Sequence, residues 1–96
     1  MELVWLKLAQ IDLEKIREYY NKEAGKTVTN KLLKKIVTSA RLIQENPLIG
    51  NKTYQDDLLE WHIPKIPFTL PYRIKNNQIQ ILRVFHQSQN KPDYWD

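Results

Sequence analysis

Residues 68–86 read Phe-Thr-Leu-Pro-Tyr-Arg-Ile-Lys-Asn-Asn-Gln-Ile-Gln-Ile-Leu-Arg-Val-Phe-His and carry the clearest strand pattern in the chain. Alternating apolar and polar residues flank the pair Asn76-Asn77 on both sides. Asparagine adopts positive φ more readily than most residues, so this pair suits a two-residue hairpin turn. We therefore expect Phe68–Lys75 and Gln78–His86 to pair as antiparallel strands.

The register of this hairpin decides which side chains share a face of the sheet. A turn at Asn76-Asn77 places Tyr72 opposite Ile81 and Leu70 opposite Arg83. Pro71 has no N–H to donate, which predicts a sheet edge or a bulge nearby. Strict alternation predicts two faces, the first formed by Phe68, Leu70, Tyr72, Ile74, Ile79, Ile81, Arg83 and Phe85, and the second by Thr69, Pro71, Arg73, Lys75, Gln80, Leu82, Val84 and His86.

Two amphipathic helices are expected before the hairpin. The first runs from Leu8 to about Tyr20, and Gly25 follows where a helix of this length should end. Thr27 is a plausible N-cap for the second helix, which should end at Asn46 because a proline follows. The apolar stripes that predict the two helices are Ala9, Leu13, Ile16 and Tyr20 in the first, and Val28, Leu32, Ile36, Ala40 and Ile43 in the second.

The remaining segments complete an α+β fold. Leu3–Lys7 and Leu58–Ile63 are short apolar runs that suit strands, and residues 47–57 have no clear period and are expected to form a loop. The predicted order is strand, helix, helix and three strands. A single domain over residues 1–96 follows, in which the two helices cover one face of an antiparallel sheet.

Composition narrows the functional classes. The chain has 96 residues, a net charge of +4 and no cysteine, which excludes disulfide scaffolds, thiol nucleophiles and cysteine zinc sites. Its two histidines and two glycines support neither a metal site nor a glycine-rich phosphate loop, so no cofactor is expected. No apolar run approaches the roughly 20 residues of a membrane helix, and no signal peptide is recognisable. A cytoplasmic protein without membrane contact is expected.

Positive charge is concentrated in residues 22–41. This segment holds six basic residues and one acidic residue, a net charge of +5. Such a cluster attracts a polyanion or an acidic partner protein. It is equally compatible with an ordinary solvated helix face.

The end of the hairpin contains groups that a metal-free ribonuclease needs. His86 can exchange a proton near neutral pH, Arg73 is expected on the same face, and Arg83 can stabilise phosphorane charge, with Tyr72 as an available phenol. These are the candidate catalytic residues. The alternative is structural: Arg83 pairs with an acid such as Glu60, and His86 ends the strand in an ordinary hydrogen bond.

The C-terminal residues Lys91-Pro92-Asp93-Tyr94-Trp95-Asp96 place two aromatic side chains on a terminal segment. Exposed aromatic side chains are costly without something to cover them. We therefore expect Tyr94 and Trp95 to contact either the domain itself or a target protein.

Four segments, taken in order, resemble the RelE/ParE superfamily of toxins from type II toxin–antitoxin systems. They are Ala9–Ile16, Leu42–Gly50, Pro67–Ile74 and Ile79–His86. The resemblance implies a compact domain with two N-terminal helices packed on an antiparallel sheet, in which the first strand lies beside the last. It also implies growth inhibition, a role in plasmid stabilisation and neutralisation by a cognate antitoxin.

The resemblance leaves the cellular target open. RelE-like members cleave messenger RNA in the ribosome, whereas ParE-like members bind DNA gyrase without being nucleases. Many members carry Arg-Glu on the strand before the Pro-Phe segment, where this chain has Leu59-Glu60. Thr69 stands where nucleases tend to have a basic residue. Together with the phrase Pro-Phe-Thr-Leu-Pro-Tyr-Arg, these differences favour a ParE-like, non-catalytic toxin. The alternatives are a metal-independent endoribonuclease and a non-toxic member. For each of these functions, a homodimer and a toxin–antitoxin hetero-oligomer both stay open.

Overall fold

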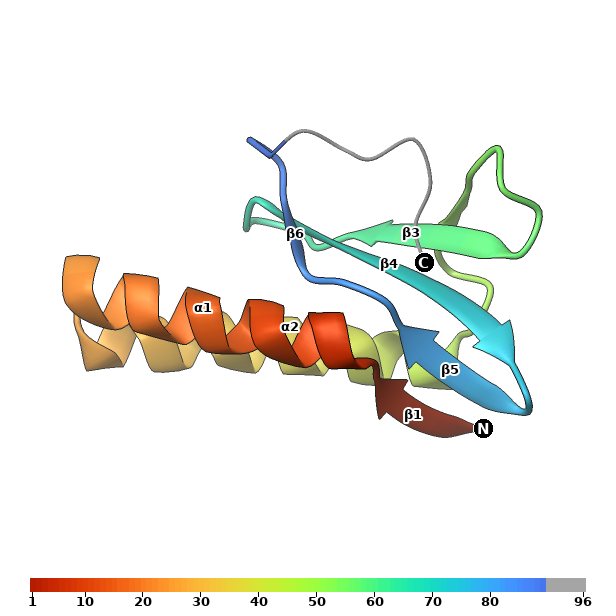
Figure 1. The fold of residues 1–96 in the computed structure, drawn as a ribbon, viewed down its shortest axis with the longest axis horizontal. Coiled ribbons are helices and arrows are strands. Elements are labelled where there is room, and N and C mark those ends of the chain that lie inside the picture. Colours follow the sequence, from red (N-terminus) through yellow and green to blue (C-terminus); the bar gives the residue numbers. More distant parts are fainter. Residues whose placement is uncertain (90–96) are drawn as a thin grey trace.

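The computed structural model describes residues 1–89 and consists of two helices packed on one face of a sheet (Figure 1). This arrangement confirms the expected α+β fold class. The elements in chain order are β1 (Glu2–Trp5), α1 (Lys7–Glu23), α2 (Lys26–Glu45), β2 (Asn51–Lys52), β3 (Leu58–His62), β4 (Phe68–Lys75), β5 (Gln78–Ile81) and β6 (Phe85–His86).

The strand order in the sheet is β1-β5-β4-β3-β2, and β6 pairs with β4 beyond the end of β5. The first strand lies beside β5, close to its expected place, but the two run parallel, so the sheet is mixed rather than wholly antiparallel. Parallel neighbours need a long connection, and here α1, α2 and three strands lie between them. The short strand β2 falls within residues 47–57, which were expected to form only a loop.

The two helices meet at Gly25, whose φ of +88° is a conformation that glycine adopts at little cost. α1 extends to Glu23, beyond its predicted end. The predicted N-cap Thr27 is wrong, because Gly25 breaks the first helix and itself occupies the capping position of α2. Thr29 donates a hydrogen bond to the Gly25 carbonyl (2.8 Å) inside the first turn. Asn46 caps the end of α2, as the following proline predicted.

The hairpin between β4 and β5 confirms the predicted turn. Asn76 and Asn77 have φ values of +54° and +57°, as a type I′ turn requires. Tyr72 faces Ile81, as expected from the turn position.

Beyond Ile81 the pairing shifts by one residue. The Leu82 N–H donates to the Pro71 carbonyl (2.9 Å), but Pro71 has no N–H to return that bond. Pairing resumes with Thr69 opposite Phe85, so residues 82–84 form a bulge. Leu70 therefore does not face Arg83, and the predicted single strand to residue 86 is divided into β5 and β6.

This shift reverses the faces predicted for the last two strand residues. His86 lies opposite Phe68, and their rings contact edge to face with centroids 5.0 Å apart. Phe85 turns to the other face, where it packs with Leu58 and Leu82. The prediction that His86 shares a face with Arg73 is therefore wrong.

The core between helices and sheet is formed by residues from both layers. Tyr72 lies at its centre, where its hydroxyl donates to the Pro47 carbonyl (2.7 Å) and accepts from the Gly50 N–H (2.9 Å). The largest apolar members are Ile36, Ile43, Phe68, Leu70, Ile79 and Ile81.

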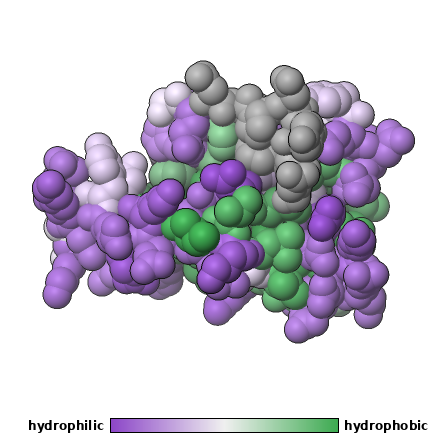
Figure 2. All heavy atoms as spheres, viewed as in Figure 1, coloured by the Kyte–Doolittle hydropathy of each residue, from purple (hydrophilic) through white to green (hydrophobic). Residues whose placement is uncertain are grey.

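The outer surface is chemically divided. Hydrophilic residues cover the turn that joins the two helices, whereas hydrophobic residues gather over β1 and the start of α1 (Figure 2). Leu8 of α1 and Met1, which precedes β1, are exposed apolar side chains. Among residues 1–89, neither helix has the length and apolar character needed to cross a bilayer.

Candidate functional site

A pocket of about 500 Å³ lies between α1 and the chain from Val84 to Gln89, and we call it the His86 pocket. The bulge and β6 form one wall, and α1 forms the other. Its lining residues are Asp12, Lys15, Ile16, Tyr19, Tyr20, Phe68, Val84, His86, Ser88 and Gln89.

Arg83 is held at the edge of this pocket by Asp12 of α1. Its Nε and a terminal nitrogen donate to the two carboxylate oxygens at 2.7 and 3.0 Å. The hydrogen bonds to Asp12 raise the pKa of Arg83, against the opposing effect of partial burial. The structural alternative predicted that Arg83 pairs with an acidic residue, and this is confirmed. The acidic residue is Asp12, however, and not Glu60. This bidentate pair uses two N–H donors of the guanidinium, which fixes the orientation of the Arg83 side chain.

His86 is fixed by the turn that follows it. Its Nδ1 accepts a hydrogen bond from the Ser88 backbone N–H (3.0 Å) and lies 2.7 Å from the Ser88 hydroxyl. A backbone N–H only donates, so Nδ1 carries no proton and the neutral ring is protonated at Nε2. Gln89 secures the same turn by accepting from the His86 N–H (2.7 Å). Nε2 is the ring nitrogen able to donate to a bound group.

Arg73 lies on the face of the sheet opposite the helices. Its Nε donates to the Gln80 side-chain oxygen (2.9 Å), and Gln80 donates in turn to Gln78 (2.9 Å). Gln78 continues the chain to Glu2 on β1 (3.1 Å). The sheet therefore separates Arg73 from His86, and the three candidate catalytic residues do not form one constellation.

Aromatic side chains of α1 form a part of the pocket that the sequence-based list of site residues did not include. Tyr20 packs edge to face on Phe68, and Tyr19 packs in the same manner on Tyr20. Tyr19 is 60% exposed. In the sequence, Tyr19 lies beside, rather than within, the apolar stripe predicted for α1. An aromatic residue at such a position cannot reach the core. That position was the signal that could have identified Tyr19 as a surface residue of a site.

The second histidine, His62, bonds through Nδ1 to the Thr69 hydroxyl (2.8 Å) on the outer face. Within residues 1–89, no three histidine or carboxylate side chains are grouped closely enough to hold a metal. Tyr94 and Trp95, expected to bind a target, lie outside the described residues.

Comparison with known proteins identifies relatives of this chain. Residues 3–91 match the family model described as the ParE toxin of type II toxin–antitoxin system, parDE. A solved chain of the chromosomal ParDE TA system from P. aeruginosa is similar in structure, with a TM-score of 0.81 and 28% sequence identity. The similarity covers 90% of this chain and 95% of that one. Comparison with curated protein sequences finds no significant match.

Proposed function

Because the chain belongs to the ParE toxin family of type II toxin–antitoxin systems, we propose that it inhibits growth by binding DNA gyrase. A cognate antitoxin neutralises it by forming a toxin–antitoxin complex. The similarity to a chain of a ParDE system supports the antitoxin as a partner. Gyrase acts on chromosomal DNA, so the proposal places the protein in the cytoplasm.

The separation of the three candidate catalytic groups supports binding rather than catalysis. Arg83 is engaged with Asp12, and Arg73 lies across the sheet from His86. A metal-free ribonuclease needs an acid, a base and a cation around one phosphate. Of the three candidate residues, only His86 lines the pocket.

A supercoiling assay tests this proposal. Purified toxin is added to gyrase with relaxed plasmid and ATP, and we expect loss of supercoiling that addition of the antitoxin reverses. Relaxation of the supercoiled form of the same plasmid by a type I topoisomerase is the control, because a protein that merely coats DNA would inhibit both enzymes. Full supercoiling at a large excess of toxin would overturn the proposal.

The His86 pocket supports a second candidate, a ribosome-dependent endoribonuclease. Its Nε2 is positioned to donate, and Lys15 and Tyr19 lie on the facing wall. Here His86 would act as general acid, with Lys15 near the phosphate. Primer extension on a translated message should then show codon-linked cuts that disappear in His86→Ala. Uncut message during growth arrest would exclude this candidate.

Expression without the antitoxin separates both candidates from a non-toxic member of the family. Either active toxin should arrest growth, and co-expression of the antitoxin should restore it. Normal growth with abundant, folded protein would instead indicate a member that has kept the fold and lost its toxicity.

A further inference from the structure

Two exposed apolar side chains flank β2, the edge strand at the end of the sheet opposite β1. Leu48 precedes this strand and is 81% exposed, and Tyr54 follows it and is 79% exposed. No other large apolar side chain among residues 1–89 is exposed to that extent. We call residues 48–54 the β2 edge.

Leu48 is carried by a backbone that is fixed to the core. The buried Tyr72 hydroxyl bonds on both sides of it, donating to the Pro47 carbonyl (2.7 Å) and accepting from the Gly50 N–H (2.9 Å). Gly50 packs so closely on Tyr72 that an added Cβ atom would lie 2.7 Å from the ring Cε1. The backbone around Leu48 is therefore ordered before a partner arrives, so little conformational entropy is lost there on binding.

Tyr54 is presented by a closed turn. The Thr53 hydroxyl accepts a hydrogen bond from the Gln55 N–H (3.1 Å), and the Leu58 N–H donates to the Gln55 carbonyl (3.1 Å). These bonds hold the residues on both sides of Tyr54. Tyrosine offers a large contact area with only two side-chain torsions to fix, and for that reason it is common among the residues that dominate binding energy at interfaces.

Leu48 and Tyr54 are close enough to enter one interface. Six residue steps of extended chain span at most about 22 Å. A standard protein–protein interface covers about 800 Å² on each partner, which is roughly 30 Å across. A hollow of about 520 Å³, lined by residues 45–49, lies beside Leu48 and offers a concave surface to a partner side chain.

Acidic residues border the β2 edge. Residues 45–57 contain three carboxylates, Glu45, Asp56 and Asp57, and one lysine, a net charge of −2. Glu45 lines the hollow beside Leu48. Asp56 and Asp57 are exposed and follow Tyr54 by two and three positions. The two apolar side chains therefore stand in a negatively charged surround, which favours a positively charged partner surface.

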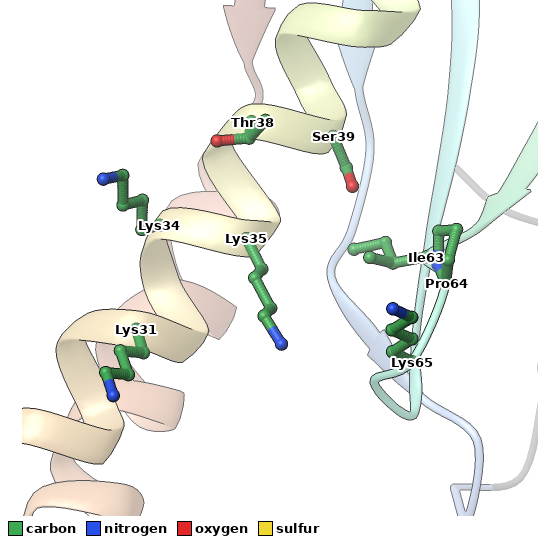
Figure 3. A pocket seen from close by; sticks show the side chains of 8 residues that line it. All are labelled: Lys31, Lys34, Lys35, Thr38, Ser39, Ile63, Pro64 and Lys65. Carbon is green, nitrogen blue, oxygen red and sulfur yellow. The ribbon is translucent and has the colours of Figure 1, made fainter.

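The basic surface of the protein lies elsewhere. Lys65, from the turn after β3, lines a groove of about 410 Å³ together with Lys31, Lys34 and Lys35 of α2 (Figure 3). None of residues 45–57 lines that groove. The groove and the β2 edge are opposite in charge, so a partner suited to one of them is repelled by the other.

We propose that the β2 edge is the surface that contacts gyrase, with Leu48 and Tyr54 as apolar anchors and with Asp56 and Asp57 facing basic residues of the enzyme. This inference rests on the proposed function. An enzyme that holds DNA needs a basic surface for the phosphates, and the acidic border of the β2 edge complements such a surface. DNA itself is a poor occupant, because its phosphates would meet the same carboxylates. A second copy of the chain would place like charges together in a symmetric contact.

The supercoiling assay tests the two anchors. With Leu48→Ser/Tyr54→Ser, half inhibition of gyrase should require on the order of tenfold more toxin, or more, because interface anchors of this kind carry most of the binding energy. Val28→Ser is the control and should leave inhibition unchanged, since Val28 is also an exposed apolar residue (49%) but lies on α2. Both variants should melt close to the wild-type temperature, because the altered side chains are exposed.

Asp56→Asn/Asp57→Asn tests the acidic border. This variant should need several-fold more toxin for half inhibition at low salt and less of an excess at high salt, because exposed charges are screened. Glu14→Gln/Glu18→Gln removes the same charge from exposed positions of α1 and should leave inhibition unchanged. Equal effects of the two double variants would show that net charge, and not the border of the β2 edge, sets the inhibition.

Capture of the cognate antitoxin by each variant separates contact with the target from neutralisation. We expect every variant to bind the antitoxin as the wild type does. Wild-type inhibition by Leu48→Ser/Tyr54→Ser would overturn this inference and leave the gyrase proposal standing. Loss of antitoxin binding together with gyrase inhibition would also overturn it, because the β2 edge would then serve the antitoxin. If the wild type itself leaves supercoiling intact, the proposed function fails and this inference fails with it.

Discussion

The side chains of Arg83 and Asp12 are joined by two hydrogen bonds, although 71 positions separate them in the sequence. Asp12 also accepts a hydrogen bond from the Val84 backbone N–H (2.9 Å). One carboxylate on α1 therefore holds both the side chain and the backbone of the bulge that follows β5. Because the bulge forms a wall of the His86 pocket, this contact positions the pocket as well as the fold.

Removing the carboxylate should destabilise the protein. In Asp12→Ala, Arg83 (30% exposed) and the Val84 N–H lose their acceptor in a partly buried place. We expect the free energy of unfolding to fall by about 2–3 kcal/mol, as for hydrogen bonds to charged groups. Urea denaturation measures it. Glu14→Ala removes an exposed carboxylate from the same helix and should change stability by less than about 0.5 kcal/mol. Equal effects of the two changes would show that the pairing contributes nothing.

The hairpin shows what local sequence predicts well. Asn76-Asn77 carries its own conformational preference, so the turn and the facing of Tyr72 and Ile81 followed from it directly. The bulge was harder to predict. Pro71 signalled an irregularity, but which strand takes the extra residue depends on packing across the sheet, including the distant contact of Asp12 with Val84.

The site was less predictable than the fold, because it combines residues that are remote in sequence. His86 was predicted to be catalytic, and that role stays a prediction. One residue of register decided that its side chain faces α1 rather than Arg73. The basic run of α2 was visible in the sequence. Nothing local indicated that Lys65, in a turn far along the chain, completes a groove with it.

The turn at Asn76-Asn77 should be improved by glycine. Both residues have positive φ, and Asn-Gly is the preferred pair for a type I′ turn. Asn77→Gly should raise the free energy of unfolding by about 0.5 kcal/mol, because glycine accepts this conformation without steric cost. Asn77→Ala is the contrasting variant and should destabilise the protein by about 1 kcal/mol. Thermal melting distinguishes the two, and a lower melting temperature for the glycine variant would contradict the type I′ assignment.

Stability should decline at alkaline pH because of Tyr72. Burial raises the pKa of its hydroxyl above the ordinary value of 10.0, and the hydrogen bond from Gly50 only partly offsets this. Between the unfolded and the folded pKa, the native state keeps a proton that the unfolded chain has lost, so stability falls as pH rises. The contribution of Tyr72 is complete below about pH 10 and decreases above it.

Tyr72→Phe isolates this contribution. The variant should be less stable at pH 7, by about 1–3 kcal/mol, because the Gly50 N–H and the Pro47 carbonyl lose their partner. The stability difference between wild type and variant should narrow above pH 10. Urea titrations of both proteins from pH 7 upward measure that difference, and a constant gap would refute the role of Tyr72 in the decline.

A methyl group at Gly50 should collide with Tyr72. A Cβ atom there would lie 2.7 Å from both the ring Cε1 and the hydroxyl oxygen of Tyr72, and 3.1 Å from the Glu60 carbonyl oxygen. Tyr72 is fully buried and cannot withdraw, so Gly50→Ala should cost about 1–3 kcal/mol as overpacking. Phenylalanine at position 72 removes one of the clashing atoms. Gly50→Ala should therefore cost less in the Tyr72→Phe background than in wild type, and a double-mutant cycle by urea denaturation measures this coupling. Strictly additive effects would mean that the loop moves away from the ring, and that Gly50 is not required for the close approach.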